Sequence, residues 1–204
     1  MIGLDLDNTI ACYDTVFQEL AVETGVVQGT WSGSRGALRR TIRETRGDAT
    51  WAMLQARVYG SEFRRVAPFP GALDCVRALQ QRGLPVAIVS HKTRVAAADT
   101  SCDLHVQAWQ WLGACGLLRE PPNGVPRERV FFEETRDQKV ARIGELRCSH
   151  FVDDLPEVFD HAGFPSTTVR VLFDPARECA GRGNAVVFHD WRGIQEYLLD
   201  YGSR

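Results

Sequence analysis

The first ten residues constrain the fold most strongly, because a short apolar run ends there in two carboxylates. A buried strand over residues 2–6 would turn Ile2 and Leu4 to one side and bring Asp5 to the point where the strand stops. Asp7 would follow in the loop. In an open parallel sheet this edge is where ligands bind. The pair therefore suggests a metal site, an acid/base pair or both, with a helix cap or an Asx turn as the structural alternative.

Length and charge narrow the class of protein. With 204 residues, of which 44% are hydrophobic, the chain can form one well-packed domain with an insertion. The 24 basic and 26 acidic residues give a net charge of -2, which argues against nucleic acid as a general partner. The six cysteines form no metal-binding pattern, so we expect reduced thiols and a cytoplasmic location without membrane insertion. The oligomeric state stays open.

Helical periodicity dominates residues 14–67, and no strand pattern interrupts it. Three helices are predicted, near 14–25, 35–46 and 49–59, with a Gly/Ser-rich break after the first. Eight arginines and six acidic residues give this interval a net charge of +2. The interval therefore reads as an all-helical insertion whose positive charge suits an anionic ligand.

From Pro68 onward, apolar runs alternate with helical segments, which predicts an α/β fold with a Rossmann-like, doubly wound parallel sheet. The sheet core should comprise residues 1–13 and 68–204, and the helical insertion residues 14–67. The predicted strands after the first are 84–89, 130–132, 151–152, 169–173 and 186–188, and the predicted helices are 70–83, 104–112, 139–146, 155–162 and 190–201.

Polar residues follow several of these strands, and the topology would bring them together at one edge. Asp5 can act as a nucleophile, since a carboxylate forms an acyl phosphate without prior deprotonation. Asp7 can protonate the leaving group and then activate water. Ser90 offers a hydroxyl to a phosphate oxygen, and Lys139 offers a positive charge. These are the parts that phosphoryl transfer needs.

The same edge offers ligands for Mg²⁺, which prefers oxygen donors and few protein carboxylates. Asp5, the Asp7 carbonyl and Asp154 would supply them, with the ion offsetting repulsion among the acids. Taken singly, Ser90 reads as a turn residue and Lys139 as a solvated helix residue. Their order at successive strand ends favours the functional interpretation.

Four segments, in this order, resemble the signature motifs of the haloacid dehalogenase superfamily: Asp5 to Ile10, Val86 to Ser90, Lys139, and Phe151 to Asp154. The resemblance covers most of the chain and implies a Rossmann-like sheet, an aspartyl-phosphate mechanism and a magnesium ion. It places residues 14–67 where that family inserts its type 1 cap, which selects the substrate. Because Asp7 is acidic, the first motif resembles that of the phosphatases and mutases of the family. By the same similarity, Asp154 is the metal ligand and Asp153 the partner of Lys139.

Several further residues are candidates for binding substrate. The short interval between Lys139 and Asp153 leaves Lys92 as an alternative for the cationic role. His91 and Lys92 directly follow Ser90 and are expected near the phosphate, as are Asn8 and Thr9 of the first motif. In the insertion, Arg35 and Arg39 share a helix face and are the candidate anion contacts. Three insertion aromatics, Trp31, Trp51 and Tyr59, fit a core better than a stacking platform.

The sequence therefore predicts a Mg²⁺-dependent phosphatase acting on a small anionic phosphomonoester through an aspartyl-phosphate. A phosphomutase would use the same groups, and a phospho-ligand binding module would keep the fold without turnover. A phosphatase acting on nucleic-acid ends is a further alternative that the acidic balance disfavours. The substrate and the pathway stay open.

Overall fold

A six-stranded parallel sheet organises the computed structural model, which describes residues 1–179 and 184–202. The strand order is β5-β4-β1-β6-β7-β8, so the first strand lies inside the sheet. The predicted Rossmann-like α/β fold is confirmed. The strands are β1 (Ile2–Leu4), β4 (Val86–His91), β5 (Val130–Glu133), β6 (His150–Asp153), β7 (Val169–Phe173) and β8 (Val186–Phe188).

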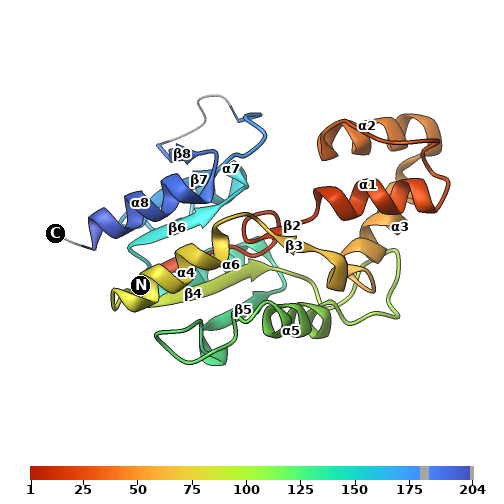
Figure 1. Ribbon diagram of the computed structural model, residues 1–204. Helices are drawn as coiled ribbons and strands as arrows, with labels where there is room; N and C mark the ends of the chain where they lie inside the picture. Colours follow the sequence, from red (N-terminus) through yellow and green to blue (C-terminus); the bar gives the residue numbers. More distant parts are fainter. Residues whose placement is uncertain (180–183, 203–204) are drawn as a thin grey trace. The chain divides into compact units, whose positions relative to one another are not determined.

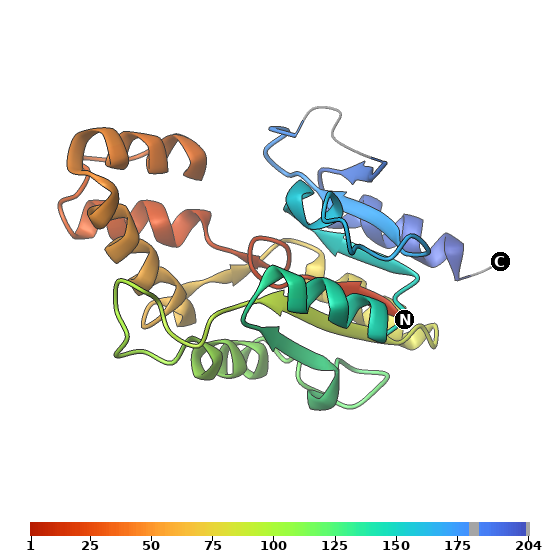
Figure 2. The same cartoon turned by 180° about the vertical axis from the view of Figure 1, so that it is seen from behind.

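Helices cover both faces of this sheet, which explains why residues 86–89 of the inner strand β4 are all apolar and buried. On the face toward the viewer in Figure 1 lie α4 (Ala72–Gln81) and α8 (Trp191–Tyr201), which contact each other. Figure 2 shows α6 (Arg136–Glu145) on the opposite face. The short α7 (Pro156–Phe159) ends earlier than the predicted 155–162 helix.

Helix α6 begins at Arg136, three residues before the predicted start at Lys139. Thr135 forms a capping box in which its Oγ1 accepts from the Gln138 N–H (3.2 Å) and its own N–H donates to Gln138 Oε1 (3.1 Å). The Thr-x-x-Gln signature was present in the sequence and was missed. Lys139 therefore lies one turn inside the helix rather than at its first residue.

The chain divides into two compact units, and the sheet belongs to the unit formed by residues 1–11, 68–92 and 112–204. The second, helical unit comprises 12–67 and also 93–111. It contains α1 (Asp14–Glu23), α2 (Arg35–Arg46), α3 (Asp48–Tyr59), the 3-10 helix η1 (Phe63–Arg65) and most of α5 (Leu104–Ala114). Two-residue strands, β2 (Ala11–Cys12) and β3 (Ala67–Pro68), form a separate small sheet. Strands this short leave no periodic pattern in the sequence. The prediction that residues 14–67 contain no strand was therefore wrong at Ala67, the first residue of β3.

Stacked aromatic rings form the core of the helical unit. Phe17 stacks on Trp51 with ring centroids 4.9 Å apart, and Phe63 stacks on Trp111 at 5.4 Å. The Trp111 indole N–H donates to the Val66 carbonyl (2.7 Å), which satisfies its buried polar atom. These contacts explain why the segment 93–111 groups with the preceding helices, a grouping that local periodicity does not reveal.

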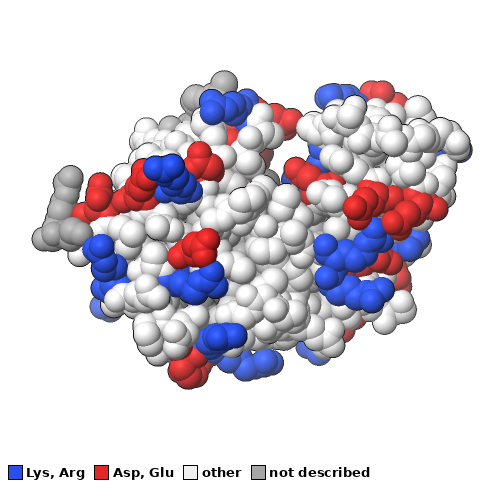
Figure 3. All heavy atoms as spheres, viewed as in Figure 1, with Lys and Arg blue, Asp and Glu red and all other residues white. Residues whose placement is uncertain are grey.

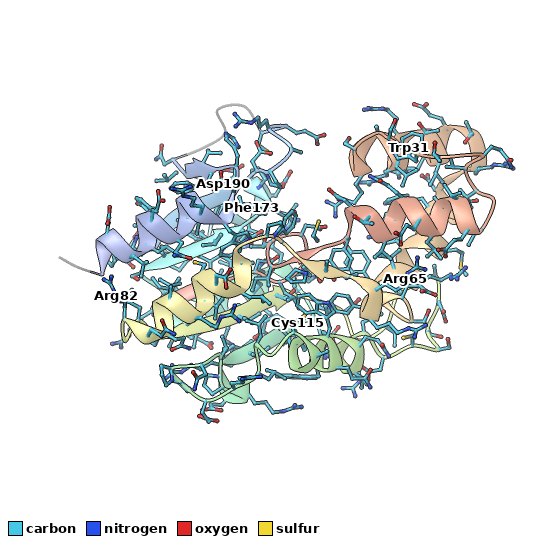
Figure 4. All side chains as sticks on the ribbon, in the orientation of Figure 1. Trp31, Arg65, Arg82, Cys115, Phe173 and Asp190 are labelled. Atoms are coloured by element: carbon cyan, nitrogen blue, oxygen red, sulfur yellow. The ribbon has the colours of Figure 1, made fainter. Side chains whose placement is uncertain are left out.

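The other insertion aromatics also have structural partners. The Tyr59 ring lies 4.4 Å from that of Tyr13, and the Trp31 indole N–H donates to the Gly33 carbonyl (3.0 Å). Figure 4 labels Trp31 in the segment before α2. The interpretation of these rings as packing residues therefore fits their contacts.

None of the helices in the described ranges is long and apolar enough to cross a membrane. All six cysteines are free thiols.

We predict that Gly3→Ala destabilises the protein by about 1–3 kcal/mol, because Gly3 lies in the central strand without room for a side chain. A Cβ there would lie 2.5 Å from Cδ2 of Phe151 and 2.9 Å from Sγ of Cys148. Gly113→Ala is the matched control, since its nearest atom would lie 4.0 Å away in α5. That control should gain about 0.5–1 kcal/mol in urea unfolding. Equal effects of the two substitutions would contradict the packing explanation.

Candidate active site

The carboxyl ends of two adjacent strands, β1 and β6, bring the acidic residues together. β1 lies between β4 and β6, with Leu4 in register with Ile88 on one side and Val152 on the other. The Asp5 N–H continues this ladder by donating to the Val152 carbonyl (2.9 Å). Asp5 therefore leaves the sheet beside Asp153, the last residue of β6. Neighbouring strand ends thus bring together residues that are far apart in the sequence.

A buried lysine bridges two of these carboxylates. Lys139 Nζ lies 2.6 Å from Oδ1 of Asp5 and 2.6 Å from Oδ2 of Asp153. All three residues are buried, with Lys139 only 2% exposed. Charge-assisted hydrogen bonds of this length hold both carboxylates in fixed positions. Of the two lysines that the sequence left open, Lys139 is the one that contacts Asp5.

Lys92, the other candidate, instead contacts Asp7. Its Nζ lies 2.9 Å from Oδ2 of Asp7, and its side chain is 2% exposed. The preceding His91 is exposed at the end of β4, and its Nε2 lies 3.2 Å from the Glu134 carbonyl. The two residues that follow Ser90 therefore lie in different surroundings, one on the surface and one within the site.

The loop after β1 is fixed by its own backbone and by the last helix. Asn8 adopts a left-handed conformation with φ of 60°, which asparagine tolerates better than most residues. The Asn8 N–H donates to the Ala11 carbonyl (2.9 Å), and the Ile10 N–H donates to the Leu6 carbonyl (3.0 Å). The Thr9 carbonyl accepts from the buried Trp191 indole N–H (3.0 Å). Trp191 was missed from the sequence, where only the helix that it begins was predicted.

Thr9 also joins two of the acids through its side chain. Its buried Oγ1 lies 3.4 Å from Oδ2 of Asp5 and 3.4 Å from Oδ1 of Asp154. Carboxylate oxygens of Asp5, Asp153 and Asp154 all lie within 4.8 Å of one another, close enough to bind one metal ion. The Asp7 side chain does not belong to this group of carboxylates. From the sequence, only the backbone carbonyl of Asp7, and not its side chain, was expected to bind the metal.

The oxygens of Asp153 are already engaged. Oδ2 accepts from Lys139, and Oδ1 accepts from the Leu155 N–H (3.0 Å). Asp153 is thus held by contacts of 2.6 and 3.0 Å, whereas the Thr9 contacts to Asp5 Oδ2 and Asp154 Oδ1 are longer, at 3.4 Å each.

Ser90 carries a buried hydroxyl that has no hydrogen-bond partner among the described residues. The residue is fully buried in β4, beside the central strand. An unsatisfied buried hydroxyl costs about 1–3 kcal/mol, so such groups in native proteins call for an explanation. A ligand oxygen accepting from Ser90 Oγ would supply one.

The site has more negative than positive charge. The pKa of Asp5 is raised to about 7, because burial, together with the charges of Asp153 and Asp7, outweighs the lowering by Lys139. Burial alone would lower the pKa of Lys139, but Asp153 and Asp5 outweigh it, so that pKa is raised and the ammonium stays charged. A divalent cation would suit the group formed by Asp5, Asp153 and Asp154, because it compensates negative charge that Lys139 alone does not.

The predicted arginines lie in the helical unit. Arg35 begins α2 and its Nε lies 3.8 Å from Oδ1 of Asp14, while Arg39 is exposed on the same helix. Some other arginines of this unit are paired with acidic residues, and Arg65 contacts both Glu19 and Glu23 at 2.7 Å. Figure 3 shows basic and acidic side chains next to each other on this unit. Substrate contact by Arg35 and Arg39 stays a prediction.

Comparisons with known proteins agree with the fold. Neither a protein-family model nor a curated protein matches the sequence. Among solved structures, a HAD family hydrolase from Deinococcus radiodurans R1 with bound phosphate and sodium has a TM-score of 0.62 at 16% identity, covering 98% of this chain and 95% of that one. The HAD superfamily is the haloacid dehalogenase superfamily.

Two further solved structures resemble this chain at similarly low sequence identity. A HAD hydrolase of family IA, variant 3, from Entamoeba histolytica has a TM-score of 0.56 at 13% identity, covering 100% of this chain and 99% of that one. A variant of CbbY from Rhodobacter sphaeroides, in complex with xylulose-1,5-bisphosphate, has a TM-score of 0.51 at 16% identity, covering 93% of each chain. The fold predicted from the motif resemblance is therefore confirmed.

We predict that the metal-free protein loses stability as pH rises, because the folded state holds a proton on Asp5 more tightly than the unfolded chain does. The pKa rises from 3.8 to about 7, so the associated stability is present below about pH 4 and is lost toward about pH 7. The loss is at most about 4 kcal/mol. Asp5→Asn should abolish this part of the pH dependence.

Thermal unfolding in a chelator at about pH 5 and about pH 8 measures this effect. Asp200→Asn, at an exposed position of α8, is the control and should keep the wild-type pH dependence. An Asp5→Asn protein with wild-type pH dependence would show that another group is responsible.

Proposed function

Given a haloacid dehalogenase-type fold with this group of acids at its strand ends, we propose that the protein is a Mg²⁺-dependent phosphatase. Its substrate would be a small anionic phosphomonoester, hydrolysed through an aspartyl-phosphate on Asp5. The observation that carries the proposal is the buried Lys139 between Asp5 and Asp153, with Asp7 two residues after Asp5. The phosphate in the Deinococcus protein and the sugar bisphosphate in the CbbY variant support the choice of substrate class.

Asp5 is the proposed nucleophile. Lys139 binds Oδ1, so we assign attack on phosphorus to Oδ2, the oxygen nearer Thr9. As the new O–P bond forms, the bond from phosphorus to the ester oxygen breaks, and Asp7 gives its proton to that leaving oxygen. Water then attacks phosphorus with Asp7 taking its proton, which releases phosphate and restores Asp5. The proton count is unchanged over the cycle.

The positive groups of the site stabilise the transferring phosphoryl group. Asp5, Asp154 and the Asp7 carbonyl would hold Mg²⁺, which would supply positive charge near the phosphoryl oxygens. Asp153 orients Lys139 through the 2.6 Å contact. Ser90 would donate its hydroxyl to a phosphate oxygen, which also satisfies its buried Oγ.

The helical insertion is proposed to act as the cap that selects the substrate, with Arg35 and Arg39 as anion contacts. This proposal rests on the position of residues 14–67 after the first strand and on their net charge of +2.

We predict that Asp5→Asn lowers hydrolysis of 4-nitrophenyl phosphate by roughly 1,000-fold or more, because the amide is a poor nucleophile. Phosphate release by the purified full chain, with Mg²⁺ and with a chelator, measures the effect. Asp200→Asn should keep wild-type rates. Wild-type activity in the Asp5→Asn protein, once a contaminating phosphatase has been excluded, would contradict the mechanism.

A screen of phosphate esters decides between the phosphatase and its alternatives. Release of inorganic phosphate, dependent on Mg²⁺, supports the proposal. An isomerised sugar phosphate without released phosphate would indicate a mutase. Ligand-induced thermal stabilisation without any turnover would indicate a binding module.

We predict that Ser90→Ala lowers kcat/KM for 4-nitrophenyl phosphate by roughly 10- to 100-fold while leaving the unfolding temperature equal or higher. The activity falls because a phosphate contact is lost, whereas stability does not fall because the hydroxyl has no partner among the described residues. Enzyme kinetics and thermal unfolding of the same preparation measure both effects. Lower stability with unchanged kcat/KM would mean that the hydroxyl has a structural role.

A further inference from the structure

The two acids of the first motif contact different lysines. Lys139 binds Asp5, whereas Lys92 binds Asp7, and both ammonium groups are almost fully buried. A buried ammonium is stable only when it is paired, so each lysine depends on the carboxylates that it contacts. The Lys92–Asp7 contact is not explained by the proposed nucleophile or by the metal ligands.

The backbone holds Lys92 in place. Strand β4 pairs with β5 up to His91, in register with Glu133, and the Lys92 N–H then donates to the Glu133 carbonyl (2.8 Å). The Lys92 backbone is thus fixed by the neighbouring strand. Asp7 is held as well, because the loop that contains it is closed by hydrogen bonds between Leu6 and residues 9–11. A lysine fixed at its backbone and buried along its side chain can orient the group that it contacts.

Resting on the proposed function, we propose that Lys92 is the positioning residue for the acid/base Asp7. Lys92 Nζ holds Oδ2 of Asp7 at 2.9 Å, and this contact limits rotation of the carboxyl group. Oδ1 is then the atom that carries the proton. In the first step the proton moves from Oδ1 to the leaving oxygen as its bond to phosphorus breaks. The Lys92 ammonium then faces the Asp7 carboxylate that remains after this proton transfer. In the second step, the attacking water returns a proton to Asp7.

This assignment differs from that of a phosphate contact, which was the expectation for Lys92. A phosphate contact acts on every substrate alike, because all phosphomonoesters carry the same group. A residue that acts through the general acid affects substrates unequally. It is needed most when the leaving oxygen is strongly basic and least when the leaving group is stable without a proton.

Substituted phenyl phosphates test the proposal, since they vary the acidity of the leaving phenol with little change in shape. In Lys92→Met, kcat/KM for phenyl phosphate should fall at least about 10-fold more than kcat/KM for 4-nitrophenyl phosphate. An equal fall for both esters, with weaker inhibition by inorganic phosphate, would overturn the proposal in favour of a phosphate contact. Arg82→Met, at the exposed end of α4 labelled in Figure 4, is the cationic control and should match wild type.

A double-mutant cycle shows whether Lys92 acts through Asp7. In an Asp7→Asn background, adding Lys92→Met should change kcat/KM for phenyl phosphate less than about 2-fold. Additive losses would overturn the proposal. If Lys92→Met does not fold, Lys92→Arg keeps the charge with altered geometry and should show a smaller loss that still depends on the leaving group. A loss in Lys92→Arg that is the same for every ester would also overturn it.

The wild-type protein separates failure of this proposal from failure of the proposed function. Wild type that releases no phosphate from any ester contradicts the phosphatase assignment, and the role of Lys92 fails with it. Wild type that hydrolyses the esters, beside a Lys92→Met protein with the same dependence on the leaving group, contradicts the role of Lys92 alone.

Discussion

The buried ion pairs of Lys139 are the interaction on which the site depends. A desolvated ammonium between Asp5 and Asp153 connects β1, β6 and α6 through two contacts of 2.6 Å. Removing one partner from such a group leaves an uncompensated buried charge, which is strongly unfavourable. The positions of the two carboxylates are therefore set by the same contacts that hold these three elements together, and the geometry of the site is coupled to the packing of the sheet.

Much of the sheet unit follows from local patterns. The apolar run that became β4 is continuous because both faces of the sheet are covered, and it ends abruptly where polar residues begin. Parallel topology then places Asp5 and Asp153 at neighbouring strand ends, although each reads in the sequence as an ordinary acidic residue. The order of the motifs along the chain was the further reason to predict that these acidic residues form one functional site.

Other parts of the site could not be predicted because they depend on contacts between distant residues. The sequence places Lys92 next to Ser90, but nothing local indicates that its side chain contacts Asp7. The same is true of Trp191, whose indole closes the loop at Thr9. In the helical unit, Trp111 packs on Phe63, and this contact joins a segment that local periodicity had assigned to the sheet core. Only the capping box at Thr135 carried a readable signal.

The central position of β1 has a consequence for how the protein folds. The strand that forms the middle of the sheet comes first in this chain, and its partners begin at Val86 and His150. No neighbouring hairpin can hold β1 in place early, because both of its pairings are parallel and join distant residues. High contact order of this kind slows folding, since loop-closure entropy is lost before the pairings form. The strand that leads into Asp5 is thus expected to be among the last to settle.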